Sequence, residues 1–325
     1  MSEVRLHIRR ETDPEVALGI DVGGTKILVG YVTRSGQMLS SQSYPMDRTS
    51  QTSSLDSVWR ATEDFLTKPW AGSVPSAIGI GVVGHTDSDT GVWMQAINIP
   101  IHEPVNLKLD LAARYGLPVT VDNDVHAAAN AELRFGAGCV YSSFVYLNVG
   151  TGIAMGIVEN GRLMRGASNY AGEIGHMLVD PHGEPCICGR RGCLEPIASG
   201  GGILGRARQM LKQYPNSSLH RYGSGLHTQL IFDEARRGDL LAERLKKEAQ
   251  EALGIALTNV VNLLNPGAVI LGGGVFQDKA FANDLLKDIR KFSLPAADAA
   301  LKCLRPSELD PKWVGLLGAA SLVWR

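Results

Sequence analysis

The 325-residue chain is predicted to be an α/β protein, because short buried strands alternate with helices along its length. Residues 16–44 contain three apolar segments separated by DVGGT and RSG, and such short connections predict antiparallel strands. AIGIGVV at residues 77–83 and PVTVD at residues 118–122 predict two further strands. Helices are expected between and after these strands, over residues 55–66, 105–115 and 125–135.

The second half of the chain repeats the opening order of strand, glycine turn and strand. FVYLNVG at residues 144–150 and IAMGIVE at residues 153–159 flank a Thr-Gly turn. This repetition indicates two related halves. The remainder is expected to hold a long helix over residues 240–264, a strand and glycine turn at residues 268–275, and a closing helix over residues 314–324.

Composition argues against two classes of partner. The 32 basic and 33 acidic residues leave a formal charge of −1, so neither a nucleic-acid groove nor an acidic membrane surface is expected as a partner. The first twenty residues carry charges throughout and lack the apolar region of a signal peptide, and no apolar run reaches the ~18 residues of a membrane span. The sequence therefore predicts a soluble cytoplasmic protein.

The first glycine turn lies between two predicted strands and comprises Asp21, Gly23, Gly24, Thr25 and Lys26. Paired glycines allow the backbone to turn tightly and present N–H groups to a phosphate, and the carboxylate suits a magnesium ion held through water. An ordinary hairpin turn is the alternative interpretation. The spacing is not that of a Walker loop.

Two more glycine turns follow predicted strands, one made of Gly150, Thr151 and Gly152 and the other of Gly272, Gly273 and Gly274. Each turn alone is a weak signal. Three such turns in one α/β chain predict a site that surrounds the triphosphate and the adenosine of ATP.

Asn123 and Asp124 stand where a predicted strand meets a helix. Aspartate is favoured as a helix N-cap, which is one interpretation of this position. The other is a catalytic base, since phosphoryl transfer to an alcohol uses a carboxylate that orients the hydroxyl and accepts its proton.

Three of the five cysteines, Cys186, Cys188 and Cys193, fall within eight positions, which predicts a metal site and not disulfides. A histidine would complete a tetrahedral zinc site; His176 is favoured over His182. A complete set of three thiolates and one imidazole is a closed, structural site, which disfavours a zinc hydrolase.

Folding of this loop around zinc is expected to bring Glu173, His176 and Glu195 together. Two carboxylates and an imidazole suit a polyhydroxyl ligand, because carboxylates accept hydrogen bonds from hydroxyl groups.

These motifs together resemble the ROK family of bacterial sugar kinases and sugar-responsive repressors, over nearly the whole chain. LGIDVGGTK resembles the family's phosphate-1 motif, VDNDVHAAA its catalytic segment and NVGTGI its phosphate-2 motif. GEIGH and CICGRRGCLE resemble its signature, and VILGGGV its adenosine-side turn.

The resemblance implies an ATP- and Mg²⁺-dependent kinase that phosphorylates a neutral hexose or N-acetylhexosamine at O6, as glucokinases and N-acetylmannosamine kinases do. Asp124 would be the general base. The implied sugar contacts are Gly84, Asn98, Asn123, Asp124, Glu173, His176 and Glu195. His176 would also bind zinc together with Cys186, Cys188 and Cys193.

The resemblance further implies an actin-like, ribonuclease-H-like fold of two lobes that close on the sugar, and a homodimer. One lobe is expected to comprise residues 1–122 and 312–325, and the other residues 123–311.

Two segments depart from the family pattern. Glucokinases of the family often read P-G-x-V-D and N-L-x-G-W where this chain has VGHTD at residues 83–87 and NIPIH at residues 98–102. The absent tryptophan and the unusual His85 are expected near the sugar, so the identity of the sugar stays open. The main alternative is a sugar-responsive regulator, although about 15 residues before the first strand are too few for a DNA-binding domain.

Overall fold

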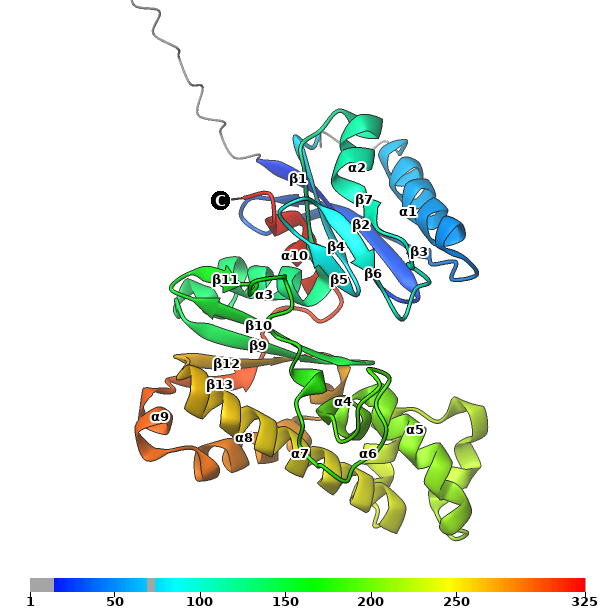
Figure 1. Ribbon diagram of the computed structural model, residues 1–325, viewed down its shortest axis with the longest axis vertical. Helices are drawn as coiled ribbons and strands as arrows, with labels where there is room; N and C mark the ends of the chain where they lie inside the picture. The colour runs from blue at the N-terminus through cyan, green and yellow to red at the C-terminus, as the bar shows by residue number, and fades with distance from the viewer. Residues whose placement is uncertain (1–14, 69–73, 325) are drawn as a thin grey trace, which may run out of the picture. The chain divides into compact units, whose positions relative to one another are not determined.

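The computed structural model describes residues 15–68 and 74–324, which form two compact units. Unit 1 contains the described residues up to Asp124 together with residues 319–324, and unit 2 contains residues 125–318. Each unit is built around a five-stranded mixed sheet (Figure 1). None of the helices within the described ranges has the length and apolar composition needed to cross a bilayer.

The sheet of unit 1 has the strand order β3-β2-β1-β4-β8. The three opening strands are antiparallel neighbours as predicted, and β4 and β8 continue the sheet in parallel with β1. The strands are β1 (Val16–Val22), β2 (Lys26–Thr33), β3 (Met38–Pro45), β4 (Ala77–Val82) and β8 (Val119–Asn123). Every residue of β4 is buried, which is typical of a central parallel strand, whereas the edge strand β3 carries mostly polar residues.

Helices α1 (Gln51–Leu66) and α2 (Leu107–Tyr115) contribute to the core of unit 1. Phe65 of α1 and Leu111 of α2 are fully buried in the cluster that contains the strand residues Ile20 and Ile80. The start predicted for α1, residue 55, was four residues too late, and the start predicted for α2, residue 105, was two residues too early.

A small three-stranded sheet was not predicted from the sequence. It consists of β5 (His85–Asp87), β6 (Val92–Gln95) and β7 (Val105–Asn106). β7 takes the first two residues of the expected helix, and the Asn106 side chain then caps α2 by accepting a hydrogen bond from the Leu109 N–H. Strands this short carry too little periodicity to be recognised.

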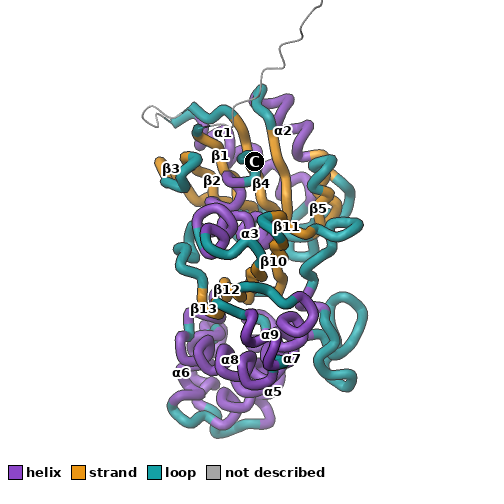
Figure 2. The backbone as a smooth tube through the Cα atoms, turned by 90° about the vertical axis from the view of Figure 1, so that its left-hand side faces the viewer, coloured by secondary structure: helices purple, strands orange, loops and turns teal. Residues whose placement is uncertain are grey.

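Unit 2 has the strand order β11-β10-β9-β12-β13, with α3 on one face and a group of helices on the other (Figures 1 and 2). Alternate residues of β9 (Phe144–Val149) explain these layers: Phe144 and Tyr146 pack with α3 (Asp124–Phe135), and Leu147 packs in the larger helical core. The other strands are β10 (Ile153–Glu159), β11 (Arg162–Met164), β12 (Ala268–Gly272) and β13 (Cys303–Pro306).

The helical layer of unit 2 is built on α7 (Leu240–Leu264), whose bounds agree with those predicted. Asp239 caps its N-terminus, and Asn265 in the left-handed conformation ends it. The layer also contains α4 (Leu194–Ala198), α5 (Gly200–Met210), α6 (Thr228–Arg236), α8 (Lys279–Phe292) and α9 (Pro295–Ala300). The closing helix α10 (Val314–Ser321) ends three residues before its predicted end.

Gly79 in the middle of β4 allows α10 to approach the sheet, because a Cβ there would lie 1.9 Å from the carbonyl oxygen of Ala319. We expect Gly79→Val to lower the free energy of unfolding by more than about 2 kcal/mol through overpacking. Gly205→Ala in α5 is the control, since its Cβ has nothing within 4 Å and alanine favours the helix. Equal unfolding midpoints in urea for both variants would contradict this interpretation.

Candidate active site and metal centre

The carboxyl ends of β1, β4 and β8 hold most of the predicted site residues of unit 1. Val22, Val82 and Asn123 are register partners across these parallel strands, so the residues that follow them start from one edge of the sheet. Ligands bind at this edge in open α/β sheets. The first glycine turn follows β1, Gly84 follows β4, and Asp124 follows β8.

The first glycine turn is closed by a hydrogen bond from the Gly23 N–H to the Lys26 carbonyl, 3.0 Å long. A Cβ on Gly24 would lie 3.6 Å from the Cβ of Asn98, so the structure places Asn98 beside this turn. Burial at the end of β1 raises the pKa of Asp21 to about 6, although the Lys26 charge opposes the shift. A carboxylate in this position suits a cation, which would favour its ionised form.

Gly84 has φ of +89°, and a Cβ there would lie 2.3 Å from the carbonyl oxygen of Gln95. Glycine is therefore required at this position. The Asn123 side chain donates a hydrogen bond from Nδ2 to the Gly84 carbonyl, 2.9 Å away, which orients its amide. Asp124 is the first residue of α3. Gly84, Asn123 and Asp124 thus lie close together in unit 1.

Trp93 of β6 is a residue of this region that the sequence did not reveal. Its indole is fully buried, and Nε1 donates a 2.8 Å hydrogen bond to the carbonyl of Val83, the residue before Gly84. The only signal was a tryptophan in a short segment between turns, which is not specific.

In unit 2, the second glycine turn joins β9 to β10 and lies against the third. Gly273 has φ of +93°, and a Cβ there would lie 2.4 Å from the Val149 carbonyl oxygen. β9 and β12 are parallel, with Asn148 opposite Gly272. The structure thus brings together two of the three glycine turns that the sequence predicted for the nucleotide.

Two further glycines at the start of α5 contact the second glycine turn. Gly200 and Gly201 donate backbone hydrogen bonds to the carbonyls of Gly150 and Thr151, at 2.8 and 3.1 Å. A Cβ on Gly201 would lie 2.7 Å from the Thr151 oxygen, so a side chain there would push the turn away. The run of three glycines at residues 200–202 was the signal that would have identified them.

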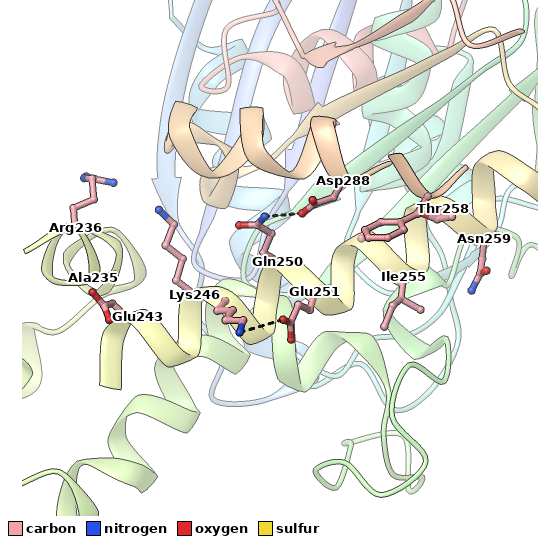
Figure 3. A pocket seen from close by; sticks show the side chains of 13 residues that line it. Ala235, Arg236, Glu243, Lys246, Gln250, Glu251, Ile255, Thr258, Asn259 and Asp288 are labelled. Carbon is pink, nitrogen blue, oxygen red and sulfur yellow. Dashed lines mark hydrogen bonds and ion pairs between the residues drawn. The ribbon is translucent and has the colours of Figure 1, made fainter. Parts of the chain in front are cut away.

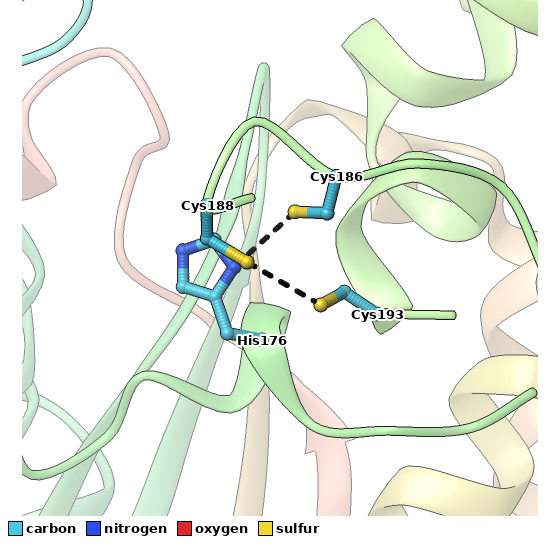
Figure 4. Close-up of side chains that lie close together, drawn as sticks. All are labelled: His176, Cys186, Cys188 and Cys193. Atoms are coloured by element: carbon cyan, nitrogen blue, oxygen red, sulfur yellow. Dashed lines mark hydrogen bonds between the residues drawn. The ribbon is translucent and has the colours of Figure 1, made fainter. Parts of the chain in front are cut away.

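The predicted metal ligands form one cluster in unit 2 (Figure 4). The ligand atoms of His176, Cys186, Cys188 and Cys193 all lie within 4.8 Å of one another. The Cys188 and Cys193 sulfurs are 3.7 Å apart, and the Cys186 sulfur is 3.5 Å from Nδ1 of His176. A tetrahedral zinc site with bonds of about 2.3 Å has edges of about 3.8 Å between sulfurs, so the cluster fits this ion.

His182, the alternative fourth ligand, lies outside the cluster and caps a turn through its backbone N–H, which donates to Asp180. Gly189 and Gly192 adopt positive φ of +85° and +76°, which allows the short loop between the cysteines to turn.

Hydrogen bonds from Arg190 lower the pKa of Cys188 to about 6, whereas burial raises the pKa of Cys193 to about 12. A bound zinc ion would deprotonate the thiols and release protons.

The residues predicted to contact the sugar in unit 2 lie beside this cluster. His176 directs Nδ1 at the thiols, while its Nε2 lies 4.0 Å from a carboxylate oxygen of Glu173. Glu195 follows Cys193 by two residues in α4 and accepts a 2.8 Å hydrogen bond from the Ile153 N–H. This contact with the backbone beside the second glycine turn was not predicted.

A groove of about 910 Å³ on α7 contains none of the predicted site residues. Its lining combines apolar residues such as Ile255 and Phe292 with charged ones such as Lys246 and Glu251 (Figure 3). The charges of both signs define no single ligand chemistry there.

Comparison with known proteins agrees with the fold. The model of the ROK family matches residues 17–325. A glucokinase of Thermotoga maritima is 31% identical over 310 residues, which cover 94% of this chain and 96% of that protein. The chain therefore belongs to the ROK family.

Solved structures extend the comparison. A ROK family glucokinase from Streptomyces griseus, in complex with glucose and AMPPNP, has a TM-score of 0.79 at 32% identity, over 94% of this chain and 98% of that one. A ROK family transcriptional regulator, a homologue of the E. coli MLC protein, has a TM-score of 0.84 at 27% identity, over 95% of this chain and 77% of that one. The chain has the actin-like ATPase fold of the family's kinases.

Zinc is expected at one equivalent per chain by elemental analysis, and Cys188→Ser should lose it. Because zinc binding contributes directly to local folding, the thermal midpoint and the affinity for sugar should fall as well. Cys139→Ser is the matched control, since Cys139 is a free cysteine outside the cluster. Metal-free protein with an unchanged thermal midpoint and full sugar affinity would refute the assignment.

Proposed function

We propose that the chain is an ATP-dependent sugar kinase that transfers a phosphoryl group to the O6 hydroxyl of a neutral hexose or N-acetylhexosamine. The observation that carries the proposal is the position of Asp124, directly after Asn123 and at the same sheet edge as the first glycine turn. A carboxylate there suits a base that accepts the hydroxyl proton. The similarity to the glucokinases of T. maritima and S. griseus supports the same reaction.

In the proposed reaction, the sugar oxygen forms a bond to the γ-phosphorus of ATP while the bond to the ADP oxygen breaks. Asp124 takes the hydroxyl proton as the new bond forms. The glycine turns at Gly23 and Gly152 would present backbone N–H groups to the phosphates. Asp21 would hold Mg²⁺ through water, and the ion would supply positive charge against the phosphates when bound.

The sugar-binding residues are proposed to select neutral hydroxyl groups. Glu173 and Glu195 supply acceptors, and Nε2 of His176 is a donor when Nδ1 binds zinc. A phosphosugar would bring negative charge against these carboxylates, which is unfavourable in a partly desolvated site. His102 at the position of the family tryptophan widens the candidates beyond glucose to 2-substituted and epimeric hexoses, including N-acetylmannosamine.

Zinc is proposed as a structural ion, because four protein ligands leave no open position for water. It would hold the loop that carries His176 and Glu195. The homodimer and the cytoplasmic location remain predictions from the sequence.

A sugar-responsive regulator is the second candidate, and the similarity to the MLC homologue favours it. A regulator needs sugar binding but no base at Asp124 and no phosphate-binding turns. Titration with duplex DNA, next to an ADP-release assay with sugars, separates the two functions.

Asp124→Asn should lower kcat at least about 10²-fold, because the amide cannot accept the hydroxyl proton. Steady-state ADP release measures this, with the thermal midpoint as a check on folding. Asp110→Asn, which changes an exposed acid in α2, should leave kcat unchanged. Turnover close to the wild-type rate in Asp124→Asn would exclude it as the base.

The chain should phosphorylate at least one free aldohexose or N-acetylhexosamine and no sugar phosphate, because two carboxylates face the sugar. A panel of glucose, mannose, fructose, allose, N-acetylglucosamine and N-acetylmannosamine tests this, with glucose 6-phosphate as the charged counterpart. Activity on glucose 6-phosphate alone would overturn the proposed substrate class.

A further inference from the structure

Glu195 connects two parts of unit 2 that are far apart in the sequence. Its Oε2 accepts the Ile153 N–H at 2.8 Å, and Ile153 follows directly on the second glycine turn. A Cβ on Gly152 would lie 2.6 Å from the same oxygen. The carboxylate therefore packs against the backbone of the turn and bonds to the residue that follows it.

The main chain around Glu195 makes further contacts in the same region. Cys193 pairs with Leu178 in an isolated β-bridge, and α4 then runs from Leu194 to Ala198. The Ser199 N–H donates to the Glu195 carbonyl, and Gly200 and Gly201 donate to the second glycine turn. A single stretch of nine residues thus leads from a metal ligand to the turn.

We infer that Glu195 is a positioning residue that sets the conformation of the second glycine turn and thereby the affinity for nucleotide. This role comes in addition to the sugar contact, and it rests on the proposed function of the turn in binding phosphates. The bond from the Ile153 N–H to Oε2 holds the start of β10. The N–H groups of the turn lie directly before this strand in the chain. Glu195 would then act in the binding of both sugar and nucleotide. The conformation of the turn would depend on the segment that follows Cys193.

Binding of Mg·AMPPNP without sugar, measured by calorimetry, tests the inference. Glu195→Ala should raise Kd about tenfold, because a backbone hydrogen bond to a charged group is lost. Glu195→Gln should restore the affinity to within about twofold of wild type, since the amide oxygen accepts the same N–H. Glu184→Ala, which removes an exposed carboxylate of the same loop, is the charge-matched control and should leave Kd unchanged.

Gly152→Ala tests the contact between Glu195 and the turn by a change in the turn. The carboxyl atoms of Glu195 are the non-neighbouring atoms that its Cβ would meet within 4 Å. Gly152→Ala should therefore weaken binding in the wild-type background and have little further effect in Glu195→Ala, a non-additive cycle. Additive losses would contradict the proposed contact.

Hydrogen exchange at the Ile153 amide gives a readout without nucleotide. Exchange should be slow in the wild type and in Glu195→Gln, and faster in Glu195→Ala. Wild-type affinity and slow exchange in Glu195→Ala would overturn the inference. Failure of the wild type to bind AMPPNP, with the exchange difference intact, would instead refute phosphate binding by the turn and leave the positioning role standing.

Discussion

The candidate site of unit 2 depends on backbone segments that touch where no side chain could fit. Gly273 lies against the Val149 carbonyl, and Gly201 lies against that of Thr151, at distances that exclude a Cβ. Gly172 likewise allows the chain before the metal ligands to reach β10, where a Cβ would lie 1.8 Å from the Met155 oxygen. Without these contacts the second glycine turn would lose its support on both sides.

The regular parts of the fold could be predicted because their signals are local. The apolar spacing of α7 and the Asp239 cap lie within the helix or next to it, and the predicted bounds agree with the structure. The small sheet β5-β6-β7 could not be predicted, because its strands have two to four residues and are stabilised by partners elsewhere in the chain. Propensity over so few residues is overridden by tertiary contacts.

The site residues likewise divide into those that a local sequence pattern reveals and those that only tertiary contacts reveal. The candidate metal ligands are recognisable because three cysteines in eight positions form a local pattern, and their positions in the structure then favour His176 over His182. The bond between Glu195 and Ile153 joins residues 42 positions apart, and the indole bond of Trp93 depends on the fold of a short hairpin. No local sequence pattern indicates that a glutamate or a tryptophan makes such a contact. These two contacts could therefore be identified only from the structure.

The position of Glu195 also gives the metal loop a role in a kinase in which a bound zinc ion would take part in no chemical step. A loop of glycines and charged residues buries little apolar surface, so it needs another source of order. A bound zinc ion would provide that order at Cys193, two residues before Glu195 and seven before Gly200. An ion at this position would fix Glu195, the carboxylate proposed to contact the sugar, together with the support of the second glycine turn. Neither could then shift without the other.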